Sequence, residues 1–156
     1  MSLSKLRITY NTKTRKHLRA ATEDWKRSII EQSNRTCWVT GKKQNGKNGV
    51  YLTVHHSSER TFNSISKQAH SNLGISYHHT TTDYGPGELN AVMDEIARIH
   101  REEHIEGICI CKEWHDRLHK EYGPHATMDQ LREMRRSYRK MNHNNRNGVY
   151  KSKRSA

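Results

Sequence analysis

The sequence contains little of the apolar material from which a protein core is built. Hydrophobic residues make up 31% of the 156, and Phe62 is the single phenylalanine. We therefore expect a small core, to which a bound metal can add stability. The length fits one domain, and a second folded unit is not expected.

Cysteine and long apolar runs are also scarce. The three cysteines are Cys37, Cys109 and Cys111. Cys109 and Cys111 alternate along a predicted strand, so their side chains point to opposite faces and cannot bridge each other. We expect no disulfide framework and a reducing environment. No apolar run reaches the ~20 residues of a membrane span, and the first residues lack the apolar region of a signal peptide. The expected location is cytoplasmic, with no membrane partner.

Acidic residues are few compared with basic ones. The chain has 28 lysines and arginines against 16 acids, which gives a formal net charge of +12. Such an excess is typical of proteins that follow the phosphates of a nucleic acid. The alternative is a merely soluble basic protein, for example one associated with ribosomes. Charge and motifs together favour a nucleic-acid partner.

Basic and turn-rich stretches divide the chain. Residues 1–21 are polar and basic, which predicts an arm that either lies along a phosphate backbone or is simply solvated. Residues 141–156 are rich in Asn, Arg, Lys and Ser, which predicts a disordered basic tail. The folded domain is expected over residues 22–140. Within it, an insertion over about 57–106 contains an amphipathic helix at residues 88–100.

Two segments with histidine pairs carry the residues of chemical interest. β-Branched and aromatic residues predict a strand over 50–54, which leads into His55 and His56. Adjacent residues on a strand point to opposite faces, so the two histidines cannot both be ordinary ligands of one ion unless the strand ends or bends there.

The second histidine pair lies on a predicted helix. Alternating apolar residues predict a strand over 107–111, followed by a helix over 112–122. Positions i and i+4 share a helix face, so His115 and His119 can converge on one cation. The pattern predicts three histidine ligands and one further histidine.

The order of Cys37-Trp38-Val39-Thr40-Gly41, Leu52 to His56 and Gly107 to His119 resembles the HNH endonuclease family of ββα-metal nucleases, especially the small enzymes of bacteriophages. The resemblance covers roughly residues 22–140. It implies an α+β fold in which a ββα-metal finger, a two-stranded hairpin plus a metal-binding helix, is embedded among additional helices. It also implies a DNA endonuclease that nicks or cleaves by one-metal-ion hydrolysis in homing or phage DNA processing, in the cytoplasm of a bacterial host cell.

The same resemblance assigns a role to each histidine. His55, His115 and His119 would bind the metal, and His56 would be the general base on water. A neutral imidazole with a pKa near ~6.5 suits that role. The resemblance implies one divalent ion, Mg²⁺ or Mn²⁺ for turnover, whereas three imidazoles favour Zn²⁺ or Ni²⁺ on affinity, so the identity of the metal stays open. No small-molecule organic cofactor is expected.

One departure from the family concerns the asparagine of its name. That residue would stand nine positions before the first helical histidine, where this chain has Glu106. Three alternatives stay open: Glu106 acts through a carboxylate oxygen, another residue such as Asn63 replaces it, or the position is irrelevant.

A second departure concerns the Cys-x-x-Cys pairs that hold a structural zinc in many relatives. Thr40 and Trp114 stand where the second cysteine of each pair would be. We therefore expect the structural zinc to be absent, with Cys37 and Cys111 as small core residues.

Four basic residues are candidates for phosphate contacts, although a charged helix face is often only solvated. They are Arg60, Lys112, Arg117 and Lys120. Two other functions compete with the nuclease. One is a catalytically inactive nucleic-acid-binding protein that retains the metal finger, which Glu106 and the missing cysteines favour. The other is a structural zinc-finger protein with no DNA role, which the charge disfavours.

Overall fold

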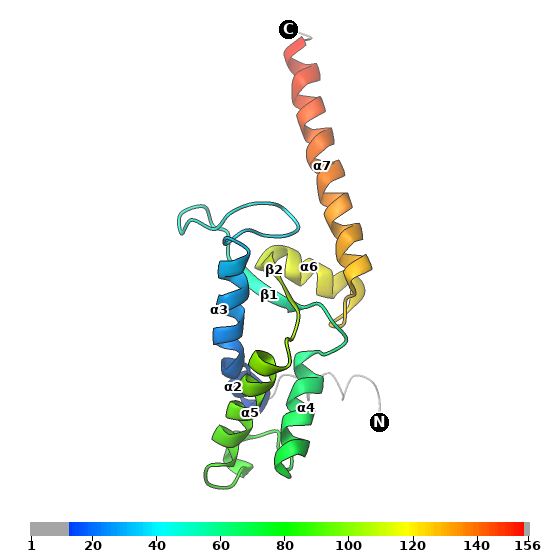
Figure 1. Ribbon diagram of the computed structural model, residues 1–156. Helices are drawn as coiled ribbons and strands as arrows, with labels where there is room; N and C mark the ends of the chain where they lie inside the picture. The colour runs from blue at the N-terminus through cyan, green and yellow to red at the C-terminus, as the bar shows by residue number, and fades with distance from the viewer. Residues whose placement is uncertain (1–12, 155–156) are drawn as a thin grey trace. The chain divides into compact units, whose positions relative to one another are not determined.

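The computed structural model describes the backbone of residues 13–154 and the side chains of residues 13–145. The fold is mixed α+β, with a two-stranded antiparallel sheet among helices (Figure 1). Among the helices of residues 13–154, none combines the length and the apolar content needed to cross a membrane. In chain order the elements are α2 (Lys13–Leu18), the 3-10 helix η1 (Arg19–Thr22), α3 (Glu23–Gln32), β1 (Leu52–His56), α4 (Phe62–Leu73), the 3-10 helix η2 (Thr81–Asp83), α5 (Glu88–Glu102), β2 (Gly107–Cys111), α6 (Lys112–Tyr122) and α7 (Met128–Arg154).

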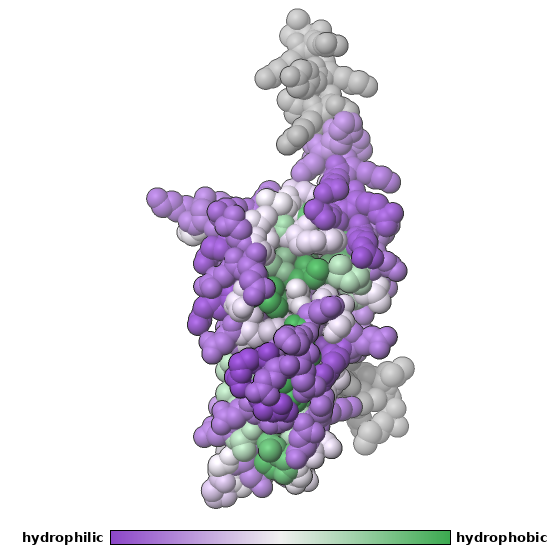
Figure 2. Space-filling model, in the orientation of Figure 1, coloured by the Kyte–Doolittle hydropathy of each residue, from purple (hydrophilic) through white to green (hydrophobic). Residues whose placement is uncertain are grey.

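The chain divides into two compact units. The first runs to Ser28 and resumes over Glu59–Glu106, and the second comprises Ile29–Ser58 and the chain from Gly107 onward. Each unit has its own cluster of buried apolar residues. The composition predicts no second folded unit, whereas the structure has two compact units. The helices of the insertion contribute apolar residues to a separate core. Hydrophilic residues cover much of the visible face, as the low apolar content requires (Figure 2).

The second unit is built on the β1–β2 pair. The strands are antiparallel, with Leu52 opposite Cys111 and His56 opposite Gly107. β1 begins two residues later than predicted and contains both histidines, whereas β2 and α6 have the predicted bounds. α6 follows β2 without an intervening residue, so the strand directs the start of the helix. The buried cluster of this unit consists of Cys37, Val39, Ile110, Cys111, Trp114, Leu118, Ala126, Leu131 and Met134.

α7 begins with a capping box formed by Thr127 and Gln130. The Gln130 side chain accepts from the Thr127 backbone N–H at 2.9 Å, and the Thr127 hydroxyl accepts from the Gln130 N–H at 3.3 Å. Tyr138 packs edge-on against Trp114 of α6, with ring centroids 5.2 Å apart. The sequence predicts a disordered basic tail over 141–156, whereas the structure describes α7 as far as Arg154, and residues 155–156 lie outside the described residues. The segment contains no proline, although its four asparagines and Gly148 are weak helix formers.

The first unit packs α4 and α5 with α2 and η1. α5 confirms the amphipathic helix predicted at 88–100, whereas α4 is an addition to the prediction. The Ser-rich and Asn-rich sequence of α4 conceals an apolar stripe of Phe62, Ile65 and Ala69, and the Thr61 hydroxyl caps it by accepting from the Ser64 N–H at 3.2 Å. The buried cluster consists of Leu18, Phe62, Ile65, Ala69, Val92, Ile96, Ile99 and Ile105.

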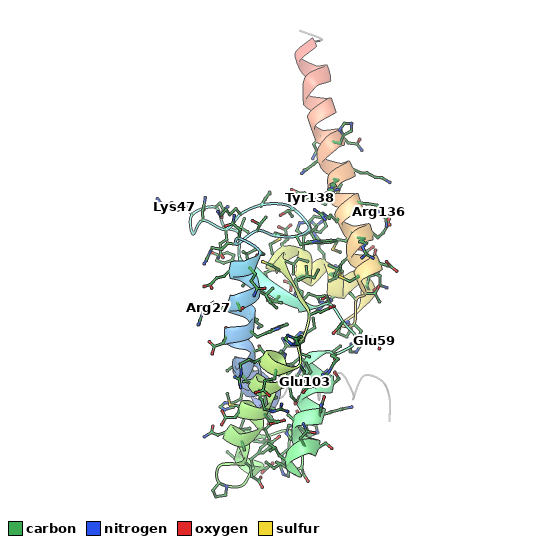
Figure 3. The ribbon with its side chains drawn as sticks, viewed as in Figure 1. Arg27, Lys47, Glu59, Glu103, Arg136 and Tyr138 are labelled. Carbon is green, nitrogen blue, oxygen red and sulfur yellow. The ribbon has the colours of Figure 1, made fainter. Side chains whose placement is uncertain are left out.

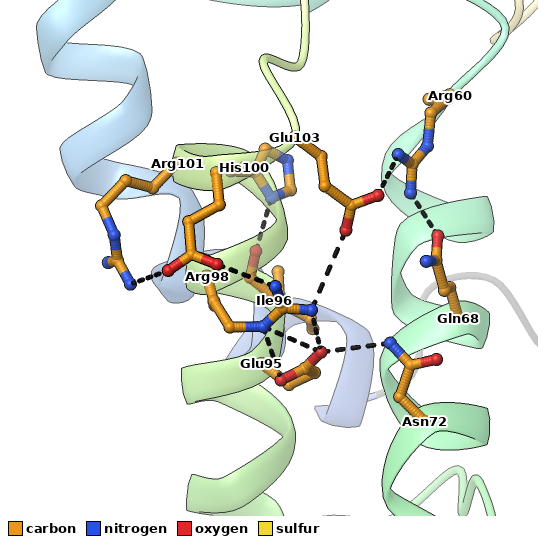
Figure 4. A network of polar contacts seen from close by, with 10 residues as sticks. Arg60, Gln68, Asn72, Glu95, Ile96, Arg98, His100, Arg101 and Glu103 are labelled. Carbon is orange, nitrogen blue, oxygen red and sulfur yellow. Dashed lines mark hydrogen bonds and ion pairs between the residues drawn. The ribbon is translucent and has the colours of Figure 1, made fainter.

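A polar network lies across α4 and α5 (Figure 4). Arg60 donates to Glu103 at 2.7 Å and also to Gln68 on α4. Asn72 of α4 donates to Glu95 of α5 at 3.1 Å. These bonds tie the exposed side of the two helices together above their apolar contact.

The predicted N-terminal arm over 1–21 is corrected for its described part. Residues 13–22 form α2 and η1, and Leu18 is fully buried in the core of the first unit. The basic residues around Leu18 dominate the composition of this segment, so the sequence alone does not indicate the tertiary packing that stabilises such a short helix. Residues 1–12 of the predicted arm lie outside the described residues.

Candidate metal centre

Three histidines of the second unit converge at one place. His55 comes from β1, and His115 and His119 come from consecutive turns of α6. Each offers one ring nitrogen, and the three nitrogens all lie within 4.8 Å of one another. Over the described side chains, this is the one group of His, Cys, Asp or Glu residues so arranged, and it could hold a metal ion.

The spacing within α6 produces half of this arrangement. His115 and His119 lie on one face of the helix, and their ring centroids are 4.1 Å apart. The His55 ring lies 5.6 Å from His115 and 5.4 Å from His119, centroid to centroid. The β1–β2 pairing sets these distances, because α6 starts directly at the end of β2.

A backbone carbonyl determines which nitrogen of His55 faces the cluster. The His55 side chain is 3% exposed, and its Nε2–H donates to the Ala126 carbonyl oxygen at 2.9 Å. The proton therefore lies on Nε2, and Nδ1 carries the lone pair. Nδ1 points to the other ligands, since it lies 3.4 Å from His119 Nε2. A hydrogen bond to the second ring nitrogen is how proteins commonly orient a histidine ligand.

Electrostatics keep His55 in the form that binds metals. Burial lowers the pKa of its imidazole below the ordinary value, and the hydrogen bond to Ala126 opposes this only in part. A metal ligand must be deprotonated, so a lowered pKa favours the ligand state. His115 and His119 are half-buried, which leaves one side of the cluster accessible. Three protein ligands with an accessible side are typical of catalytic rather than structural sites.

His56 does not belong to the cluster. It follows His55 on β1, so its side chain points to the other face of the strand. Its cross-strand partner is Gly107, which has no side chain to cover it. His56 is half-buried and therefore accessible to solvent. The prediction that the adjacent histidines separate into one ligand candidate and one other agrees with this geometry.

Three predicted residues belong to the first unit. Glu106 is exposed, and Asn63 lies in the first turn of α4. The guanidinium of Arg60 takes part in the network with Glu103 and Gln68. Glu106 is not a member of the metal-binding group, and the roles proposed for it and for Asn63 stay predictions.

The three other predicted phosphate contacts lie on α6. Lys112 is the exposed first residue of the helix. Arg117 lies two positions after His115, about 200° around the helix, so it occupies the opposite face. Its guanidinium stacks on Trp114 at 4.7 Å and pairs with Glu113 at 3.6 Å. Arg117 and Lys120 line a pocket of about 450 Å³ between α6 and α7. Both side chains therefore lie away from the histidine face of α6.

Two cysteines lie together in the core of the second unit. Cys37 and Cys111 are buried, and the Cys37 sulfur accepts from the Cys111 backbone N–H at 3.2 Å. The Cys111 thiol also bonds to this sulfur, which lowers the pKa of Cys37 and raises that of Cys111. Trp114 belongs to the same buried cluster as the two cysteines. The sequence-based prediction of both cysteines as small core residues agrees with their burial.

One functional group could not have been found in the sequence. The Ala126 carbonyl orients His55 from 71 residues away, and the residue type gives no sign of what a backbone oxygen does.

No family model, curated protein or solved structure matches the chain in comparisons with known proteins. The candidate site therefore rests on the geometry described above.

Proposed function

We propose that this protein is a metal-dependent DNA endonuclease of the HNH type, which hydrolyses phosphodiester bonds at the three-histidine site. The observation that carries the proposal is the convergence of His55, His115 and His119 on a β1–β2–α6 unit, with their ring nitrogens within 4.8 Å. In this proposal that unit is the ββα-metal finger. No relative supports the proposal, so it rests on the geometry of the site and on a direct test.

The donor set fits a divalent cation. Three imidazoles hold borderline ions such as Zn²⁺ or Ni²⁺ most tightly, and Mg²⁺ or Mn²⁺ more weakly. A cation held there would supply positive charge that stabilises the charge developing on a scissile phosphate. His55 is held in its ligand tautomer by Ala126, and the half-buried pair on α6 leaves room for a phosphate oxygen.

His56 is proposed as the general base. Its side chain is accessible and lies next to the cluster along β1, but on the other face of the strand. A neutral imidazole can take the proton of an attacking water at physiological pH. The separation of the two side chains on β1 supports a division of tasks, in which His55 holds the ion and His56 accepts a proton.

The net charge of the chain supports a polyanionic substrate. The net charge of +12 matches a polyanion and steers it towards the protein. DNA is proposed as the substrate on the resemblance described above. The family context also supports a phage origin, with a role in homing or DNA processing inside a bacterial cell.

A nicking assay tests the proposal. Supercoiled plasmid is incubated with the protein and Mg²⁺, Mn²⁺, Zn²⁺ or EDTA, and relaxed and linear products are quantified. We expect cleavage in at least one metal and none in EDTA. His56→Ala is expected to reduce the rate by about 10²–10⁴-fold, which is the usual contribution of a general base.

A matched histidine serves as the control. His17 is exposed on α2 of the first unit, and His17→Ala is expected to cleave at the wild-type rate. Equal cleavage by His56→Ala and the wild type would remove His56 from the mechanism. Cleavage that persists in EDTA would remove the metal.

A protein that binds nucleic acid without cutting is the second candidate. The observation that favours it is Glu106, an exposed acid that stands where the family has asparagine. DNA binding that weakens with salt, without cleavage in any of the metals, would establish this candidate instead.

A further inference from the structure

The described part of α7 has two faces of different chemistry. Leu131 and Met134 are buried in the core of the second unit, and Tyr138 packs on Trp114. The other side of the helix is exposed and basic. This basic stripe consists of Arg132, Arg136, Arg139, Lys140 and His143.

Helical geometry brings these basic residues together. At 100° per residue, the five positions fall within a sector of about 100°, opposite the sector that holds Leu131, Met134 and Tyr138. Figure 3 shows Arg136 and Tyr138 on different sides of the helix, and Figure 2 shows hydrophilic residues along its visible face. Residues 132 and 143 are eleven positions apart, so the stripe is about 16 Å long.

The acidic residues near the stripe do not neutralise it. Arg132 pairs with Asp129 at 2.8 Å, and Arg136 pairs with Glu133 at 3.4 Å. Both pairs are between exposed neighbours on one helix, where such pairs contribute little. The side chains of Arg132 and Arg136 remain 58% and 65% exposed, so both guanidinium groups can still reach an anion.

We infer that the basic stripe of α7 is a docking surface for double-stranded DNA, which it contacts through backbone phosphates along a groove. The inference rests on the proposed function and adds the element that holds the substrate. Duplex DNA carries a phosphate charge for every ~1.7 Å of its axis, so a stripe of this length meets several phosphates. The major groove, about 12 Å wide, admits a helix.

The same features disfavour other nucleic acids. Proteins that bind single strands stack bases on aromatic side chains, and the stripe contains no Phe, Tyr or Trp. A-form RNA has a deep and narrow major groove that is closed to a helix of this kind. Double-stranded DNA is therefore the partner that the stripe fits.

The test measures DNA binding in EDTA, so that cleavage plays no part. A failure of the proposed nuclease activity is then distinguishable from a failure of the proposed docking surface. A fluorescent duplex is titrated at salt concentrations between ~50 and ~200 mM. The variant is Arg132→Ala/Arg136→Ala/Arg139→Ala. Alanine is the best helix former, so α7 is expected to persist, and far-UV circular dichroism checks this.

We expect the DNA affinity of the triple alanine variant of α7 to depend less on salt than that of the wild type. Each lost phosphate contact lowers the slope of log K against log salt by about 0.9, so three lost contacts lower it by about 2.7. Over that salt range, the wild type should lose about 40-fold more affinity than the variant. The variant with lysine at the same three positions keeps the charge and should keep the wild-type slope within about one contact.

The control removes the same charge elsewhere. Arg27→Ala/Lys67→Ala/Arg101→Ala changes three exposed residues of the first unit and should keep the wild-type slope. Equal losses in both triple alanine variants would show an effect of net charge and overturn the proposal. A wild-type slope in the α7 variant, or equal affinity for double-stranded RNA of the same length, would overturn it as well.

Discussion

Replacing His55 and His119 one at a time separates the structural and metal-binding parts of the site. Both residues belong to the candidate metal centre, but their surroundings differ. His55 is 3% exposed and donates to the Ala126 carbonyl at 2.9 Å, whereas His119 is half-buried. The two alanine variants should therefore differ in stability without metal, and both should lose the gain in stability that metal gives.

The expected magnitudes follow from these contacts. Without metal, His55→Ala leaves the buried Ala126 carbonyl without its donor, which costs about 1–3 kcal/mol. Lost packing adds to this, so the free energy of unfolding should fall by roughly 2–4 kcal/mol. His119→Ala should cost less than about 1 kcal/mol, because the side chain is partly solvated.

Metal binding provides the second measurement. An ion at 100 times its dissociation constant stabilises the folded wild type by about 2.7 kcal/mol. Either variant lacks one of three ligands and should show little of this gain. The assay is urea unfolding in EDTA and in Zn²⁺, followed by circular dichroism, with Zn²⁺ affinity measured separately by titration calorimetry.

Two results would refute the reasoning. A full Zn²⁺-dependent gain in His119→Ala would show that the three histidines do not hold the ion together. An unchanged stability of His55→Ala in EDTA would show that the Ala126 bond does not hold the ring. His17→Ala, on the surface of α2, should match the wild type in both media and serves as the control.

Two further predictions concern the cores of the two units. In the first unit, His100 is 2% exposed, and burial lowers the pKa of its imidazole. As the pH falls below ~6.5, this histidine is therefore protonated in the unfolded chain before it is protonated in the folded chain. The stability that the neutral histidine contributes is complete above that pH and is lost as the pH falls. The loss is at most about 1.4 kcal/mol per pH unit. Urea unfolding between pH ~7 and ~5 should show a shallower dependence for His100→Gln, and equal slopes would contradict the prediction. In the second unit, Leu118→Ala empties a fully buried position on α6, next to His119, and should lower the free energy of unfolding by about 2–5 kcal/mol. A loss below about 1 kcal/mol in denaturant titrations would show that α6 is not held by this core.

Elements with strong local patterns could be predicted from the sequence. The bounds of β2 and α6 agree with the prediction because alternation, the helical period and the Gly123-Pro124 stop are all local signals. β1 begins two residues later than predicted, since the pairing of Leu52 with Cys111 sets its register, and β propensity does not contain that information.

Elements that depend on burial could not be predicted. α2 lies in a basic stretch, yet Leu18 is fully buried among α4 and α5 residues of the first unit. α4 has a polar composition, and its apolar stripe gains its stability only against α5. In both cases tertiary packing outweighs weak local propensity.

The sequence by itself determined which residues could bind a metal, because the i and i+4 spacing of His115 and His119 places both on one helix face wherever the helix forms. It also determined that His55 and His56 separate, because neighbours on a strand point to opposite faces. Only the tertiary structure decided that His55 joins the helical pair and that its Nδ1 is the nitrogen that faces them. The reason is physical: the hydrogen bond from Nε2 to the Ala126 carbonyl forms only when segments 71 residues apart fold together.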